Sequence, residues 1–348
     1  MRFRLVAALC VAATFAAPFA CGSEVVYSTE SSSIRDGIVQ GATVRRMVDG
    51  IVIRLTGKRT VAEAWRTWIR PTDRVGIKVA TSAGRPAGVH PAVVDAVVAG
   101  LREAGVPPAN IIVWDRRLED LQVAGFSRST TEYTLRWIEG GAGYDETKPL
   151  TLPVLGKLIA GDFAFENRRA ARFKELFRDP EPLSDESHFT RILTRDVDKI
   201  INIPSLTDSF LTGVAGAIPN LTIGNMDNWR RFTKPPLFGA PYIAEIYAEP
   251  LIRDKVVVHL LDALYVQYAG GPFPDPNNTR PHFAIFGSTD PVALDALAVK
   301  LIDEYRLPAK LPALKASADY VKSAAELGLG SASVSDNALI RVGSEDFR

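Results

Sequence analysis

Charged side chains end two short apolar segments of the chain, in positions that suit the binding of a polar ligand. Lys78 lies near the end of residues 74–79, and Asp115 ends residues 111–115, directly before Arg116. The Lys78 ammonium could hold an anionic group, and the Asp115 carboxylate could bind a cation or act as a base. Two structural interpretations stay equally open: Lys78 could extend along the surface to solvent, and Asp115 could form an ion pair with Arg116.

Four further polar residues interrupt or follow apolar segments and complete the predicted ligand-binding set, namely Asn202, Asp208, Asn220 and Asp262. The amide of Asn202 must find partners inside an apolar strand, which favours a structural role. Asp208 could hold a cation, but its Thr-Asp-Ser context is more typical of a turn. Asn220 follows a glycine-rich stretch as a hydrogen-bonding residue. Asp262 ends a predicted strand, where a cleft would lie.

Several familiar chemistries have no support in the sequence. Gly213 and Gly216 lack the lysine and the other glycines of a phosphate-binding loop. On a strand, His259 and Asp262 point to opposite faces, so they cannot share a metal, and His259 is predicted to be a core residue. Neither a Gly-x-Ser-x-Gly nor a His-Glu-x-x-His motif occurs. We therefore predict no metal site and assign no catalytic residue.

Composition and charge exclude further classes. The 348 residues carry 41 basic and 40 acidic side chains, a formal net charge of +1, which does not favour a nucleic-acid partner. The two cysteines are Cys10 and Cys21, both at the N-terminal end. We expect no internal disulfide and no iron–sulfur cluster, and no cofactor is indicated. A small-molecule ligand is the expected partner, and the sequence does not indicate an oligomeric state.

The N-terminal residues have the organisation of an export signal. Arg2 and Arg4 precede an apolar run over residues 5–17 that is too short to cross a bilayer, so residues 1–22 are predicted to be a signal peptide. Cys21 is a candidate for lipidation, although Pro18 and Phe19 favour ordinary cleavage slightly. The protein is therefore expected to be periplasmic or secreted, with a lipid anchor as its one route to a membrane. Residues 23–34 are rich in Ser and Thr and are interpreted as a tether.

Strands and helices alternate over the rest of the chain. Apolar residues at helical spacing from Ile38 to Leu55 predict a first helix, and residues 74–79, a helix opened by Pro91, and residues 111–115 form a strand–helix–strand unit. Residues 161–196 are charge-rich and predict an exposed helix followed by a loop. Further strands are expected at 199–203, 255–262, 283–286 and 338–342, with helices after Asp290 and over about 313–327. This order predicts one α/β domain over residues 35–348, with a mostly parallel sheet and helices on both faces, built as a single body or as two intimate sub-lobes.

Several of these segments together resemble the bacterial and archaeal family called domain of unknown function 362. Their order over residues 74–330 carries the resemblance, because no single piece is specific. The matching pieces are Val75-Gly-Ile-Lys78, Asp115-Arg116, Lys199-Ile-Ile-Asn-Ile-Pro204, Thr212-Gly-Val-Ala-Gly-Ala-Ile-Pro-Asn-Leu221, Asp262-Ala-Leu264, Gly270-Gly-Pro272, Ser288-Thr-Asp-Pro-Val-Ala-Leu-Asp295 and Ala324-Glu-Leu-Gly-Leu-Gly330. The resemblance implies an α/β fold with a polar cleft at the carboxyl ends of strands, and little about chemistry.

The departures from the family pattern affect groups that bind anions or transfer protons. Ala80 stands where the family usually has Asn, Thr207-Asp208-Ser209 replaces Lys-x-His, and Pro219 replaces a lysine. Phe232 stands where close relatives often have a histidine. Two hypotheses follow. The cleft binds a small anionic ligand or a cation, or the chain is a catalytically degenerate member that acts as a binding or scaffold protein at the cell envelope.

Overall fold

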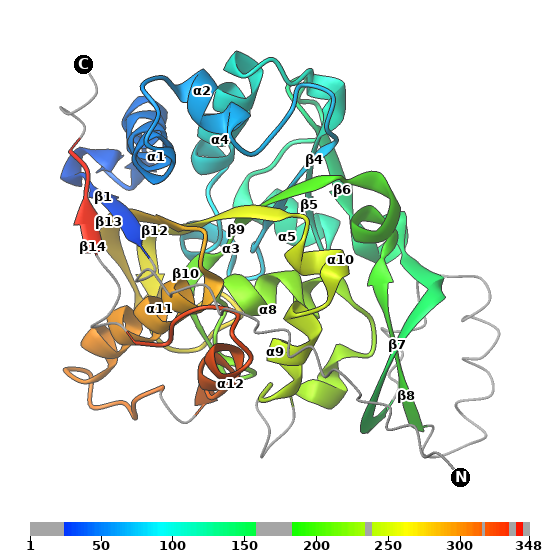
Figure 1. Ribbon diagram of the computed structural model, residues 1–348. Helices are drawn as coiled ribbons and strands as arrows, with labels where there is room; N and C mark the ends of the chain where they lie inside the picture. The colour runs from blue at the N-terminus through cyan, green and yellow to red at the C-terminus, as the bar shows by residue number, and fades with distance from the viewer. Residues whose placement is uncertain (1–23, 158–182, 234–238, 315–316, 334–338, 344–348) are drawn as a thin grey trace, which may run out of the picture.

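The computed structural model describes residues 24–157, 183–233, 239–314, 317–333 and 339–343. A mixed sheet in the order β14-β1-β13-β12-β9-β4-β5-β6 forms its centre, with β10 and β11 attached beside β12. Most of the pairings along this path are parallel, and helices cover both faces (Figure 1). The predicted α/β class is therefore confirmed.

Five neighbouring parallel strands form the part of the sheet that positions the site. They are β6 (Thr134–Trp137), β5 (Ile111–Asp115), β4 (Val75–Val79), β9 (Lys199–Ile203) and β12 (Val256–Gln267). From β4 the chain continues outward through β5 and β6, then returns to add β9 and β12 on the other side of β4. The strand order thus reverses at β4 and β9. In open α/β sheets, ligands bind beyond the carboxyl ends of the strands at such a reversal.

The sheet is completed by strands of mixed direction. β13 (Thr279–Ser288) runs antiparallel to β12 and to β1 (Val25–Thr29), and β14 (Leu339–Arg341) runs parallel to β1. β10 (Ser205–Ser209) pairs in parallel with β12, and its other end pairs antiparallel with β11 (Gly213–Val214). These two short strands carry the chain from β9 toward the edge of the site.

Each face of the sheet buries its own apolar core. One face packs against α1 (Gly41–Thr56), α2 (Val61–Arg66) and α4 (Pro91–Glu103), and Ile77, Val113 and Ile201 point into that core. The other face packs against α8 (Ala217–Leu221), α9 (Tyr242–Tyr247), α11 (Pro291–Arg306) and α12 (Tyr320–Glu326), as Figure 1 shows. Because strand side chains alternate between faces, Lys78 faces the second layer while its neighbours Ile77 and Val79 face the first.

Local sequence signals fix the helix ends near the site. Pro91 occupies the first position of α4, where no amide donor is needed, and Gly105 follows the helix with a φ of 97°. Asp290 caps α11 by accepting hydrogen bonds from the amides of Val292 and Ala293 at 2.8 and 2.9 Å. Both features agree with the sequence prediction.

Three local predictions were wrong. Part of the expected tether is strand β1, in which Val25 and Val26 are fully buried between β13 and β14. The loop expected at the end of residues 161–196 includes β8 (Leu183–Thr190), although residues 158–182 lie outside the described ranges. The last helix, α12, is shorter than predicted. Pairing with other segments decided the first two of these structures.

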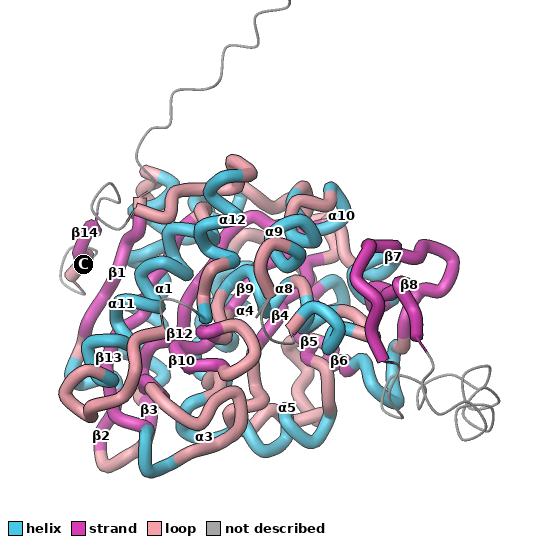
Figure 2. The backbone as a smooth tube through the Cα atoms, turned by 90° about the horizontal axis from the view of Figure 1, so that it is seen from below, coloured by secondary structure: helices cyan, strands magenta, loops and turns pink. Residues whose placement is uncertain are grey.

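β7 (Tyr144–Lys157) and β8 form a hairpin that projects from the body (Figure 2). The buried Arg231 anchors it by donating to the carbonyls of Leu152 and Val154 and to the Ser187 hydroxyl. The other α-helices and strands within the described residues are short: β2 (Ile34–Arg35), β3 (Ile38–Val39), α3 (Gly84–Ala87), α5 (Leu118–Ala124) and α10 (Pro250–Arg253). None of the described helices is long and apolar enough to cross a membrane.

Candidate ligand-binding cleft

A row of polar side chains crosses four adjacent strands on the α8 face of the sheet. Trp114, Lys78, Asn202 and His259 occupy matching register positions on β5, β4, β9 and β12. Residues that match in register on parallel strands point to the same face, so the four side chains lie side by side. All four are almost completely buried, and each therefore needs a hydrogen-bond partner.

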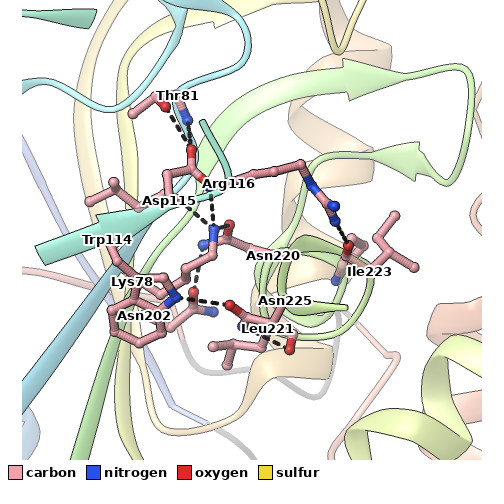
Figure 3. A network of polar contacts seen from close by, with 12 residues as sticks. Lys78, Thr81, Trp114, Asp115, Arg116, Asn202, Asn220, Leu221, Ile223 and Asn225 are labelled. Carbon is pink, nitrogen blue, oxygen red and sulfur yellow. Dashed lines mark hydrogen bonds and ion pairs between the residues drawn. The ribbon is translucent and has the colours of Figure 1, made fainter. Parts of the chain in front are cut away.

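Lys78 is at the centre of this row, and its ammonium is fully satisfied (Figure 3). Nζ donates to the Val79 carbonyl at 2.7 Å, to Asp115 Oδ1 at 2.7 Å and to Asn220 Oδ1 at 2.8 Å. The three acceptors come from β4, β5 and α8. An unpaired ammonium at 0% exposure would be very costly, so this geometry fixes the three elements relative to one another.

Asp115 uses both carboxylate oxygens within the protein. Oδ1 accepts from Lys78 and from the Arg116 amide at 2.7 Å, and Oδ2 accepts from the amide and the hydroxyl of Thr81 at 2.8 and 2.6 Å. Burial alone would raise the pKa of this carboxyl, but the Lys78 ammonium and these hydrogen bonds hold the pKa below its usual value. The carboxylate is therefore charged, and each of its two oxygens already accepts two hydrogen bonds within the protein.

A chain of hydrogen bonds continues from Lys78 into the core. Asn220 Nδ2 donates to Asn202 Oδ1 at 2.8 Å, and Asn202 Nδ2 lies 2.9 Å from His259 Nδ1. Nε2 of His259 lies 3.3 Å from the Tyr247 hydroxyl. Burial lowers the pKa of His259 to about 3, so the imidazole is neutral and accepts from Asn202 at Nδ1. His259 is thus a satisfied core histidine, as the sequence predicted.

Helix α8, which presents Asn220, is held by a buried carboxylate on α11. Asp295 accepts hydrogen bonds from the amides of Ala217 and Ile218 and, at 2.9 Å, from the Tyr320 hydroxyl. Burial raises the pKa of Asp295 to about 7. The Asp295 side chain also lies where a Cβ at Gly216 would be, which explains the glycine before this helix.

A cleft of about 360 Å³ opens above Lys78, Asp115 and Asn220. These three residues form its floor, at the carboxyl ends of β4 and β5. The charged side chains that line it are four cations and two carboxylates: Lys78, Arg116, Arg117, Arg230, Asp115 and Asp120. Much of the remaining lining is apolar, including Val123, Leu211, Ile223, Trp229 and Phe273.

Arginine side chains shape one wall of the cleft. Arg116 donates to the carbonyls of Ile223 and Met226, and its guanidinium lies 5.4 Å from the centroid of the Trp229 ring. Arg230 lies 4.5 Å from the same ring. Both distances suit cation–π contact, so the Trp229 ring and two positive charges form one unit.

The structure brings four of the seven predicted ligand-binding residues to the cleft lining: Lys78, Asp115, Arg116 and Asn220. Asn202 lies directly beneath Asn220 and supports it, in agreement with the favoured structural role. Asp208 accepts from the Gly271 amide at 2.8 Å and orders the 270–274 loop instead of lining the cleft. Asp262 lies elsewhere and accepts from the His90 amide and the His90 ring, both at 2.8 Å. Cys21 lies outside the described residues.

Sequence reasoning did not find Asp120, Trp229 or Arg230. Asp120 lies on α5 one turn after Arg116, and this close spacing to a predicted site residue was the available signal. Trp229 and Arg230 form part of a 3-10 helix (Trp229–Phe232) whose approach to β5 depends entirely on the tertiary fold. Within the described ranges, no group of three or more His, Cys, Asp and Glu side chains is placed to hold a metal ion.

Comparison with known proteins agrees with the resemblance noted in the sequence. Residues 175–300 match the family model of a domain of unknown function (DUF362). The predicted resemblance is confirmed over that segment, which includes Asn202 and Asn220 but not Lys78 or Asp115. No curated protein matches the chain.

A crystal structure of a protein from Thermotoga maritima is similar with a TM-score of 0.39 and 13% identity. The match covers 80% of this chain and 61% of the other, so this chain spans less than two thirds of that protein.

The Lys78–Asp115 pair gives a prediction for stability. Lys78→Met leaves a buried carboxylate without its counter-charge, so the free energy of unfolding should fall by about 3–5 kcal/mol. With Asp115→Asn added, the loss should be smaller than the sum of the two single losses by about 1–3 kcal/mol, measured in urea. Lys322→Met, which removes an exposed partner of Glu326 at 3.7 Å, is the control and should change stability little. Simple additivity of the two buried changes would contradict the ion pair.

Proposed function

We propose that this chain is an exported α/β protein whose cleft binds a small anionic ligand. The charge balance of the lining carries the proposal: four cationic side chains face two carboxylates. Glu139 pairs with both Arg116 and Arg117, and the balance stays positive when it is included. A cleft lined by one predominant sign of charge attracts ligands of the opposite sign.

The geometry favours an anion over a cation. Each oxygen of Asp115 already accepts two hydrogen bonds, so the carboxylate that could have bound a cation is occupied. Asp120 is the other carboxylate in the lining, and a single carboxylate among four cations is a poor cation site. The contacts to an anion would come from Arg117 and Arg230 on the walls, because the Lys78 ammonium in the floor already donates to three protein acceptors and acts through its charge.

Calorimetry with sulfate and methanesulfonate, which keep constant charge near neutral pH, tests the proposal. The unmodified protein should bind them, and Arg117→Gln or Arg230→Gln should weaken binding by about threefold to tenfold through the loss of one positive charge. Arg253→Gln removes an exposed arginine that pairs with the adjacent Asp254 and does not line the cleft. This control should bind normally. Absence of binding, or an equal loss in the control, would refute an anion site in the cleft.

Asp120 gives this binding a defined pH dependence. Burial, with the nearby Asp115 charge, raises the pKa of Asp120 to about 6. Above that pH the carboxylate repels an anion, and below it the neutral acid does not. Sulfate affinity should therefore rise by about threefold to tenfold as the pH falls from 7.5 to 5. Asp120→Asn should bind sulfate more tightly at pH 7.5 and lose most of the dependence; a variant that kept the full dependence would exclude Asp120 as its source.

Export is part of the proposal because residues 1–22 have the pattern of a signal peptide. Strand β1 begins at Val25, so cleavage near residue 22 would leave the sheet intact. Fractionation of expressing cells should find the processed protein outside the cytoplasm. Metabolic acyl labelling of the parent that is lost in Cys21→Ser would establish a lipid anchor, whereas no labelling of either would establish soluble release. Unprocessed protein in the cytoplasm would contradict export.

A degenerate family member with a binding or scaffold role is the second candidate. One observation favours it: three positions where the chain departs from the family pattern, Ala80, Ser209 and Pro219, line the cleft. The groups missing relative to the family pattern would thus lie within the site. On this view the cleft still binds its anion and no longer transforms it.

A further inference from the structure

We infer that the anion bound by this cleft carries a flat apolar group, such as an aromatic ring, beside its charged group. This inference rests on the proposed function and specifies its ligand class. It rests on a cluster of exposed apolar side chains around the mouth of the cleft. Binding of an anion by the charged residues alone would not require this cluster.

Three large apolar side chains at the mouth are more than half exposed. Val123, Phe210 and Phe273 are 59%, 59% and 58% exposed, and they are three of the seven strongly exposed large apolar side chains in the described part of the chain. Isolated exposed apolar residues are common on protein surfaces, but a cluster at the rim of a cleft commonly marks a binding site. The clustering is therefore the significant observation.

The members of the cluster lie near one another. The rings of Phe210 and Phe273 pack at a centroid distance of 6.2 Å, and Phe273 lines the cleft directly. Val123 and Pro274 approach each other across Gly84, since a Cβ there would lie 3.1 Å from one and 3.2 Å from the other. Three separate segments thus contribute to one apolar rim: α5 with Val123, the residue after β10 with Phe210, and the 270–274 loop with Phe273 and Pro274.

Apolar side chains also line the interior of the cleft, as far as the arginines. Trp229 lines the cleft with Arg230 4.5 Å and Arg116 5.4 Å from its ring centroid. A ring that enters past Phe273 would find an aromatic surface, while an attached anionic group would find arginine charge beside it. The volume of about 360 Å³ is at the lower end for small-molecule sites, which favours a ligand of one or two rings over a polymer.

Methanesulfonate and benzenesulfonate form a matched pair of probes, because they share one charged group and differ by the ring. Burial of a phenyl ring should make benzenesulfonate bind about tenfold to hundredfold more tightly to the unmodified protein. The double variant Val123→Ser/Phe273→Ser should reduce that ratio to about threefold or less, chiefly by weakening the binding of benzenesulfonate. Ile38→Ser, at a side chain 67% exposed that is not among the cleft-lining residues, should keep the full ratio.

Each outcome separates this inference from the function on which it rests. Equal affinity of the two probes for the parent would overturn the ring-binding mouth and leave anion binding intact. A high ratio that survives in the double variant would place ring recognition elsewhere and also overturn the inference. Failure of both probes to bind would remove the proposed function itself. Thermal melts of both variants should match the parent, because the substituted side chains are exposed.

Discussion

A buried ammonium group at the reversal of the strand order governs the geometry of this molecule. Lys78 has no exposure to water, and its charge is tolerated because three acceptors meet it at 2.7–2.8 Å. Two belong to neighbouring strands and the third to helix α8, so the same contacts that satisfy the charge also join the sheet to its covering layer. Helix α8 is held at its other end by Asp295, and the floor of the cleft is fixed from both sides.

The floor and the walls of the cleft therefore have different tasks. Lys78 and Asp115 use their polar atoms on each other and on their neighbours, so they contribute charge and shape and little direct contact. The side chains placed to touch the proposed ligand come from Arg117 and α5, from the helix that contains Trp229 and from the loop after Gly271. Rigid strand ends below and variable loops above are the usual division of labour in α/β proteins.

The central unit of the fold could be predicted from the sequence because its signals are local. Strands β4 and β5 are short apolar runs, and Pro91 marks the start of the helix that joins them. Lys78 and Asp115 follow as neighbours from the rule that parallel strands end at one edge. Strand β1 could not be predicted, since the Ser- and Thr-rich segment becomes a strand only by pairing with β13 and β14, more than 250 residues away.

The errors in predicting the site residues from the sequence have a related cause. Asp208 lies within β10 and Asp262 in the middle of β12, and their carboxylates accept hydrogen bonds from the amides of Gly271 and His90, contacts that sequence spacing does not reveal. Asp120 and Trp229 reach the cleft from elements whose approach depends on tertiary packing. The position of a residue along a strand predicts the place from which its side chain extends. Its hydrogen-bond partners, which depend on tertiary packing, determine the direction in which its polar atoms point.

The hydrogen-bond chain beneath the cleft has a direction, and that direction has a consequence. From Lys78 through Asn220 and Asn202 to His259, each donor points away from the ammonium and each amide oxygen points toward it. The two amide dipoles are thus aligned and together stabilise the positive charge from below. Turning either amide over would set donor against donor in a buried site, so the arrangement has one stable state. The floor of the cleft is therefore polarised in advance, and selectivity for the proposed anion would have to arise at the rim.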